Sequence, residues 1–156
     1  CEAHVVGAVG APGLRRDLVA MWPGKRFVTV ASKAAHVDPL CIIGAGSVIA
    51  PGVVITTDVV VGEHCQLNIG VTISHDVQLG SFVTVGPGAH IAGRVRIGDG
   101  VFVGMGANIA QGVTIASGVT IGAGATVLND VSTPCAVVVG VPAEVIKIRG
   151  GWLDVL

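Results

Sequence analysis

The sequence predicts an all-β solenoid, a parallel β-helix of hexapeptide repeats with a partial α/β flank at its N-terminal end. Two observations predict this fold. Every sixth residue from Val37 to Val127 is aliphatic, without exception. The residue that follows each of these positions is mostly Gly, Ala, Ser or Thr, and glycine alone supplies 24 residues of the chain. A period of six is not a helical period, but it fits a short strand followed by a corner.

Three such hexapeptides make a triangular coil, and successive coils stack about 4.8 Å apart. The large aliphatic side chain fills the interior, and a smaller residue two positions earlier prevents overfilling. A sandwich of short strands is the alternative, but hairpin turns would not keep one period over so many residues. The aliphatic positions expected to point inward are Val37, Ile43, Ile49, Ile55, Val61, Leu67, Ile73, Leu79, Val85, Ile91, Ile97, Val103, Ile109, Ile115, Ile121 and Val127.

The N-terminal flank is not periodic, so we assign residues 1–34 to the end of a small α/β domain whose first part lies outside the sequence. We expect a strand over residues 4–10, a helix over 13–21 and a strand over 26–30. The spaced glycines at 7, 10 and 13 fit a tight turn and a helix start better than a phosphate loop, because no complete βαβ unit surrounds them.

The β-helix itself is assigned to residues 35–133, and residues 134–156 to a C-terminal cap and tail. Pro134 and Pro142 interrupt the repeat there. We expect a last strand over residues 136–140 to cap the solenoid, as terminal repeats must, and a short helical or irregular tail to follow it.

The composition argues against several classes of protein. A net charge of −1 without a basic block argues against nucleic acid and anionic membranes as partners. The chain is 51% hydrophobic, yet no apolar run is long enough for a transmembrane helix. No signal-peptide pattern opens the sequence, which begins with Cys rather than Met. The four cysteines lack CxxC spacing and fit buried thiols in a reducing compartment, so we expect a cytoplasmic protein.

The polar pair His75–Asp76 is the candidate catalytic feature. His75 follows the inward Ile73 by two residues and therefore points outward near a corner. One coil later, at a spacing of 18, stands Gly93, which leaves room beside the imidazole and offers a backbone N–H that could stabilise an oxyanion. Asp76 could orient the imidazole if the chain bends at this corner. An outward histidine near an edge would lie in a cleft if copies of the prism packed around a three-fold axis.

The other histidines are interpreted as solvated surface residues. These are His36, His64 and His90, of which His90 could also line an acceptor cleft. Their spacings do not fit the three-histidine zinc site of a hydratase of the γ-carbonic anhydrase kind, so no metal ligands are predicted. Arg94 and Arg96 fit a solvated face better than a phosphate site.

The stretch LNIGVTISHDVQLGSFVTVGPGAHIAGRVRIGDGVFVGMGANI (67–109) and the stretch VVVGVPAEVI (137–146) closely resemble the hexapeptide-repeat acetyltransferases. Within that group the chain resembles the sialic-acid O-acetyltransferases and bacterial amino-sugar N-acetyltransferases. The resemblance implies a left-handed β-helix, a Rossmann-like N-terminal domain, a homotrimer, acetyl-CoA as cosubstrate and a sugar acceptor, with no metal.

The resemblance also implies residue roles. His75 would be the general base, Asp76 the carboxylate that tunes it, and Gly93 the oxyanion donor. Asn68 and Thr84 would contact the acceptor, although some amino-sugar members carry a histidine where this chain has Thr84. The CoA arm would follow an intersubunit groove, whose wall includes the Pro87, Met105 and Ala123 column, past Ala92, Gly93, Met105, Ala110 and Ala123.

Two readings besides acetyl transfer to a sugar amine or hydroxyl remain open at this point. One is a catalytically inactive β-helix that serves as a scaffold or binding protein. The other is the zinc hydratase. An ice-binding face is not supported, because the threonines do not form one long column. The sequence does not decide between a nucleotide amino sugar and a sialic acid as acceptor.

Overall fold

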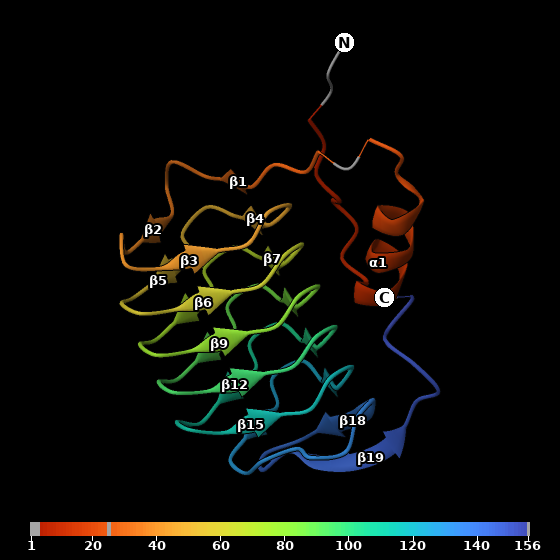
Figure 1. Ribbon diagram of the computed structural model, residues 1–156. Helices are drawn as coiled ribbons and strands as arrows, with labels where there is room; N and C mark the ends of the chain where they lie inside the picture. The colour runs from red at the N-terminus through yellow and green to blue at the C-terminus, as the bar shows by residue number, and fades with distance from the viewer. Residues whose placement is uncertain (1–3, 25, 156) are drawn as a thin grey trace.

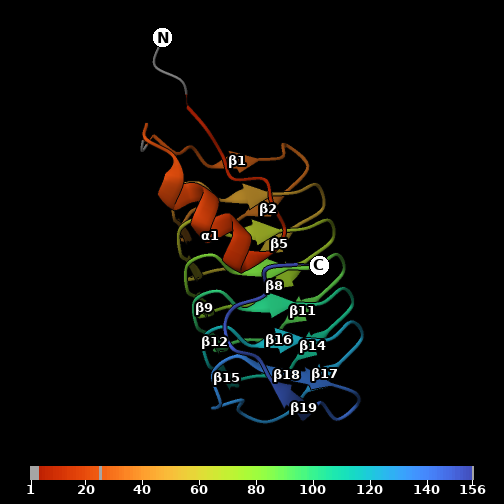
Figure 2. The same ribbon diagram turned by 90° about the vertical axis from the view of Figure 1, so that its right-hand side faces the viewer.

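The computed structural model describes residues 4–24 and 26–155, and it contains the predicted β-helix. Two-residue strands recur every six residues and build three parallel sheets, which form the sides of a triangular prism (Figure 1). The single described helix, α1 (Pro12–Met21), runs alongside the coils on one side of the prism (Figure 2). The prediction of an all-β solenoid with a partial α/β flank is therefore confirmed.

We name the three sheets I, II and III in the order in which each coil visits them. Sheet I contains β1 (Val30–Ala31), β4 (Val48–Ile49), β7 (Gln66–Leu67), β10 (Thr84–Val85), β13 (Phe102–Val103), β16 (Thr120–Ile121), β18 (Ala136–Val139) and β19 (Glu144–Ile148). Sheet II contains β2 (His36–Val37), β5 (Val54–Ile55), β8 (Thr72–Ile73), β11 (His90–Ile91), β14 (Asn108–Ile109) and β17 (Thr126–Val127). Sheet III contains β3 (Ile42–Ile43), β6 (Val60–Val61), β9 (Gln78–Leu79), β12 (Arg96–Ile97) and β15 (Thr114–Ile115).

Strands of one sheet pair in register at a spacing of 18 residues, as Thr84 pairs with Phe102. The second residue of each two-residue strand from β4 to β17 is buried and points into the prism. Val37 and Ile43, in the first coil, are half-buried because no earlier coil covers them. Burying one such aliphatic side chain is worth about 1.5–3 kcal/mol, so the continuous apolar interior is what holds the coils together.

The N-terminal flank differs in part from the expectation. The helix is confirmed, with Pro12 in its first turn, where the missing N–H costs nothing. The strands expected over 4–10 and 26–30 shrink to a single parallel bridge between Val5 and Phe27. Val30 instead begins β1, which pairs with β4 and forms the first rung of sheet I. The end of the segment predicted as a flank strand therefore belongs to the solenoid, because it pairs with the edge of β4.

The C-terminal end also differs in part. β18 caps sheet I within one residue of the predicted strand. The tail expected to be helical or irregular instead contains β19, which pairs antiparallel with β18. The segment is rich in β-branched residues, which favours a strand. Residues 149–155 then return along sheet I to the base of α1 (Figure 1), where the N–H of Gly13 donates to the carbonyl of Leu153 at 2.9 Å.

Arg15 fixes α1 to the solenoid. Its side chain is fully buried. Its guanidinium donates to carbonyls of the flank, at Val9 and Gly10, and to carbonyls of the coils, at His64 and Phe82. Burial lowers the pKa of Arg15 to about 10, so the group is still a cation at neutral pH. A buried cation surrounded by neutral oxygens is tolerated because every side of it is hydrogen-bonded.

An aromatic column follows the corner between sheets III and I. His64 stacks on Phe82 with ring centroids 5.0 Å apart, and Phe27 meets the imidazole edge-on at 4.6 Å. Further along, the indole of Trp152 lies at 6.2 Å from Phe82, over positions where glycines leave space. The prediction that His64 is a solvated surface residue was wrong: it is 6% exposed. Its position points outward from the coil, but the N-terminal flank covers it.

We expect the stability of the fold to decrease as the pH falls below about 6.5, because of His64. Burial lowers the pKa of His64, an effect that Glu63 opposes and Arg15 reinforces. The unfolded chain therefore takes up a proton at a pH where the folded chain still excludes it, which favours unfolding between the ordinary histidine pKa and the lowered one. Urea denaturation at about pH 7.5 and about pH 5.5 checks this. His64→Phe keeps an aromatic ring in the column and should reduce the pH difference; an equal difference in both proteins would contradict the assignment.

Candidate active site

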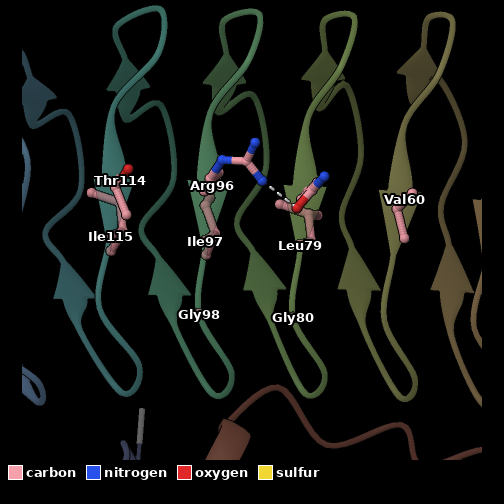
Figure 3. Close-up of a pocket in the computed structure, with 9 residues that line it drawn as sticks. Val60, Leu79, Gly80, Arg96, Ile97, Gly98, Thr114 and Ile115 are labelled. Carbon is pink, nitrogen blue, oxygen red and sulfur yellow. Dashed lines mark hydrogen bonds between the residues drawn. The ribbon is translucent and has the colours of Figure 1, made fainter.

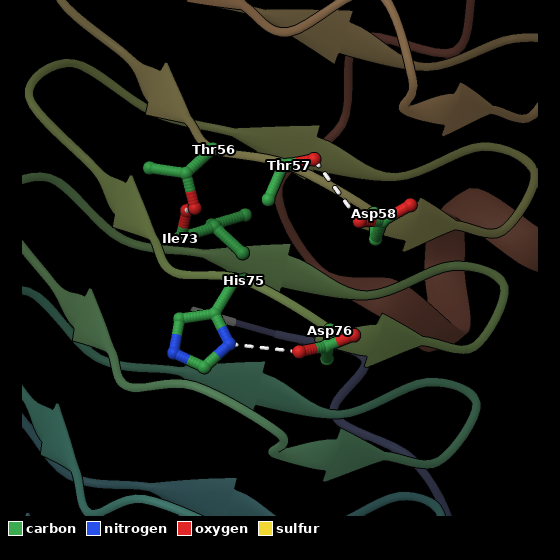
Figure 4. A network of polar contacts seen from close by, with 6 residues as sticks. All are labelled: Thr56, Thr57, Asp58, Ile73, His75 and Asp76. Atoms are coloured by element: carbon green, nitrogen blue, oxygen red, sulfur yellow. Dashed lines mark hydrogen bonds and ion pairs between the residues drawn. The ribbon is translucent and has the colours of Figure 1, made fainter.

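His75 and Asp76 form a hydrogen-bonded pair at the corner between sheets II and III (Figure 4). The chain leaves β8 at Ile73, and Asp76 adopts a positive φ of 59°. This backbone conformation turns the corner and brings two consecutive side chains to the same side. His75 Nδ1 lies 2.8 Å from Asp76 Oδ2, and the two side chains are 44% and 57% exposed. The bend that the proposed role of Asp76 required is therefore present.

Gly93 lies directly against the imidazole of His75. A Cβ atom added to Gly93 would come within 2.6 Å of His75 Nε2, so any side chain at this position would displace the ring. The two residues belong to successive coils, joined where the N–H of Arg94 donates to the carbonyl of His75 at 2.9 Å. Within the described ranges, no hydrogen bond uses the N–H of Gly93 itself. The N–H of Gly93 is thus not used by another described group, as the predicted role of an oxyanion donor requires.

Charges are distributed unevenly along this corner. One coil before His75, Thr57 Oγ1 donates to Asp58 Oδ2 at 3.0 Å, and the carbonyl of Thr57 accepts the N–H of Asp76 (Figure 4). Carboxylates therefore occupy the corner in two successive coils. One coil after them, Arg94 occupies the matching position and is exposed. The corner changes from negative to positive across the imidazole.

The arrangement fits proton transfer at His75 Nε2. When Nδ1–H donates to the Asp76 carboxylate, Nε2 carries the lone pair. A carboxylate in this position fixes the ring and stabilises the imidazolium that forms when the ring takes a proton. A nucleophile placed at Nε2 could thus transfer its proton to the ring.

The residues predicted to line the CoA groove fall on two different corners. Ala92, Gly93 and Ala110 belong to the corner between sheets II and III, beside His75. Met105 and Ala123, with Pro87, form a stacked column at the corner between sheets I and II. Sheet II lies between the two corners. The predicted column of Pro87, Met105 and Ala123 is therefore continuous within one chain, but it lies two hexapeptides away from the residues beside His75.

Comparison with known proteins places these features in a family. A sequence profile for the family described as "Bacterial transferase hexapeptide (six repeats)" matches residues 58–93 and 94–129. PerB from Caulobacter crescentus, solved with CoA and GDP-perosamine, is 31% identical; its TM-score is 0.89, over 93% of this chain and 70% of that chain. The acetyltransferase domain of PglB from Neisseria gonorrhoeae, solved with acetyl coenzyme A, is 34% identical; its TM-score is 0.84, over 89% of this chain and 68% of that one. The chain belongs to the hexapeptide-repeat acetyltransferases.

A third similar structure, WeeI from Acinetobacter baumannii, is 30% identical, with a TM-score of 0.88 over 92% of this chain and 70% of that chain. No curated protein sequence matches this acetyltransferase chain significantly. The structural similarity extends over the N-terminal flank as well as the coils, since it covers nearly the whole chain. The family membership confirms the resemblance that the sequence motifs indicated.

The two predicted acceptor residues are not brought to His75 within this acetyltransferase chain. Thr84 lies on sheet I and is 2% exposed; its hydroxyl donates to the carbonyl of Gly10 and accepts from Arg15. The prediction that Thr84 contacts an acceptor was wrong for this reason: the side chain is buried under the flank. Asn68 follows β7 at the corner between sheets I and II, and its Nδ2 donates to the carbonyl of Val85 at 2.9 Å. Asn68 is only half-buried.

The remaining histidines lie apart from His75. His36 is exposed on sheet II, as expected. His90 is exposed on the same sheet, and its Nδ1 lies 2.8 Å from Thr72 Oγ1. In the part of the chain that the structure describes, no group of three or more His, Cys, Asp or Glu residues could hold a metal ion. Nor does any helix in that part have the length and apolar character needed to cross a membrane.

The described cysteines are free thiols. Cys65 is buried, and burial raises the pKa of this thiol to about 12. Cys41 and Cys135 are half-buried, so the expectation of buried thiols holds fully only for Cys65. Cys1 lies outside the described residues.

Proposed function

We propose that this chain is an acetyl-CoA-dependent acetyltransferase that acetylates a sugar amine or hydroxyl, with His75 as the general base. One observation carries the proposal: an imidazole, held by a carboxylate at Nδ1, lies against a glycine whose N–H is unengaged. PerB was solved with CoA and GDP-perosamine, and PglB with acetyl coenzyme A. These relatives favour a nucleotide amino sugar over a sialic acid as acceptor.

Acetyl-CoA supplies the acetyl group as a thioester. His75 Nε2 removes a proton from the acceptor nitrogen as that nitrogen attacks the carbonyl carbon, and Asp76 stabilises the resulting imidazolium. The Gly93 N–H donates to the carbonyl oxygen, where negative charge develops; one such donor is worth about 10²–10³-fold in rate. The imidazolium then returns its proton to the departing thiolate, so the base is restored at the end of the cycle.

In a homotrimer, the two corners that carry the groove residues could lie side by side, each contributed by a different copy. Sheet I is covered by α1 and the C-terminal tail, which leaves sheets II and III free. Three copies arranged with sheet II toward a three-fold axis would place the His75 corner of one copy beside the Met105 corner of the next. In such a trimer the pantetheine arm lies in the seam between Gly93 of one copy and Met105 of its neighbour.

The free thiols fit a cytoplasmic location, which we include in the proposal.

The proposal predicts release of free CoA when acetyl-CoA is mixed with a nucleotide-linked amino sugar. A thiol-reactive dye follows the release, and mass spectrometry detects the acetylated sugar. The acceptors to compare are nucleotide amino sugars, the corresponding free amino sugars and sialic acid. Sedimentation checks that the active species contains three copies.

Two outcomes would contradict the proposal. Binding of acetyl-CoA without turnover on any of these acceptors would favour an inactive binding protein. Activity that sediments with a single copy would contradict the composite seam but leave the role of His75 in place.

A further inference from the structure

The outer face of sheet III carries a hollow that the proposed mechanism does not use (Figure 3). It has a volume of about 530 Å³ and extends over β6, β9, β12 and β15. The outward residues of these strands are Val60, Gln78, Arg96 and Thr114, which stack at a spacing of 18. Sheet III meets sheet II at the corner of His75, so this hollow begins where the catalytic corner ends.

Arg96 is the charged group in the hollow. Its guanidinium donates through one terminal nitrogen to Oε1 of Gln78, and Figure 3 shows it extended across the face from β12 toward β9. Among the described residues, no carboxylate forms an ion pair with Arg96. A guanidinium has five N–H donors, so several of them are free for a ligand. Because Gln78 accepts from Arg96 through Oε1, its amide NH₂ is oriented as a second donor on the same face.

Arg96 lies on the same coil as the glycine that faces His75 Nε2. Arg96 follows Gly93 by three residues on the same coil, which corresponds to about 10 Å of extended backbone. His75 Nε2 lies against Gly93. A ligand that reaches both groups must therefore carry its anion about one sugar ring away from the atom that loses a proton. In a sugar phosphate, the anomeric phosphate is one ring away from a ring amine. In CoA, the whole pantetheine arm separates the phosphates from the thioester.

The positive charge near the corner matches the anionic end of such a ligand. Asp76 holds Nδ1 of His75, whereas Nε2 lies against Gly93, on the following coil. Arg94 and Arg96 belong to that same coil and are both exposed. An acceptor that reaches Nε2 therefore meets positive charge on the coil of Gly93, which favours an anionic group such as a phosphate there.

We propose that the sheet III hollow is an acceptor subsite, in which Arg96 binds the phosphate on the anomeric carbon of the sugar. The inference rests on the proposed acetyltransferase function and adds the residue that holds the phosphate of the acceptor. Arginine is suited to the role because its planar fork makes two parallel hydrogen bonds to phosphate oxygens. Gln78 holds the fork in place, and the Thr114 hydroxyl lies on the adjacent strand.

The test compares wild-type enzyme with Arg96→Gln in steady-state kinetics. The acceptors are a nucleotide diphosphate amino sugar and the same amino sugar without phosphate. We expect Arg96→Gln to raise KM for the nucleotide sugar by about 10- to 100-fold, as for loss of a hydrogen bond to a charged group. KM for acetyl-CoA and the rate with the free amino sugar should stay within about two-fold. Lys147→Gln, which removes one exposed positive charge on β19, serves as the matched control and should behave as wild type.

Each other outcome overturns the inference. An unchanged KM for the nucleotide sugar would show that the hollow is an ordinary solvated face. A rise in KM for acetyl-CoA alone would assign the arginine to the CoA phosphates. If wild type transfers no acetyl group, the proposed function fails, and calorimetric titration of inorganic pyrophosphate still tests the subsite: equal binding to wild type and Arg96→Gln would contradict it.

Discussion

Replacement of His75 with alanine is expected to lower kcat for acetyl transfer by about 10²–10⁴-fold, the usual contribution of a general base. KM for acetyl-CoA should change little, because in the proposed mechanism the imidazole interacts with the acceptor proton and not with the CoA arm. Among the described residues, the ring bonds to Asp76 and lies against Gly93, and its side chain is 44% exposed, so its removal should not unfold the corner. Steady-state assays of CoA release, with circular dichroism to verify folding, provide the measurement.

His90→Ala is the matched control for this experiment. His90 is also exposed and also hydrogen-bonded through Nδ1, in this case to Thr72. Among the described residues, however, no carboxylate contacts its Nδ1. Because His90 lies on sheet II, which faces the axis of the proposed trimer, sedimentation verifies that the variant still assembles. We expect its kcat to stay within about three-fold of wild type, well below the effect of losing a general base. Equal losses in the two variants, or full activity in His75→Ala, would remove His75 from the catalytic role.

The repeat made most of the fold predictable from sequence. In a solenoid without insertions, a difference of 18 in residue number is a direct contact between coils. The proximity of His75 to Gly93 could therefore be predicted before the structure, which confirms it: a Cβ atom added to Gly93 would lie 2.6 Å from His75 Nε2. The same regularity identified the inward aliphatic residues, since each two-residue strand has one outward and one inward side chain.

The spacing of 18 residues between stacked positions also predicts that the predicted groove residues form two separate columns. Ala110 and Gly93 differ by about one coil, whereas Met105 differs from Gly93 by only two hexapeptides. Residues that are not about 18 apart, or a multiple of it, lie on different corners, so Met105 could not stack on Gly93. The separation was therefore predictable from numbering alone, and the proposed trimer is how we account for a groove that uses both columns.

The docking of the flanks was not predictable in this way. His64 and Thr84 occupy outward positions of regular coils, and the repeat alone describes both as solvated. They are buried because α1, the preceding loop and the returning tail lie over sheet I. Those contacts join residues that have no periodic relation, such as Gly13 with Leu153. The local sequence pattern does not predict such long-range contacts. The burial of Arg15 was equally unpredictable, because the other charged residues of its helix are exposed.

Substitution should therefore cost more stability at Arg15 than elsewhere in the flank. We expect Arg15→Met to weaken the packing of the flank on the coils by about 3–5 kcal/mol. Methionine has a similar length but no donor, so buried carbonyls such as those of His64 and Phe82 would lose their partner. Each unsatisfied buried acceptor costs about 1–3 kcal/mol, and the relief of the desolvated cation offsets only part of this. Arg15→Lys should not rescue the fold, since one ammonium cannot reach acceptors on both the flank and the coils.

The loss should be local, because the coils contact mainly their neighbours and need not unfold with the flank. Amide hydrogens of α1 would then exchange faster in the variant, while those of the central strands would keep their protection from exchange. Arg16→Ala is the control in the same helix: Arg16 is exposed, pairs with Asp17 at 3.0 Å and lies 4.8 Å from the Trp152 ring centroid, contacts worth about 1 kcal/mol or less. If Arg15→Met and Arg16→Ala gave equal exchange in α1, the guanidinium would not be what fastens the helix to sheet I.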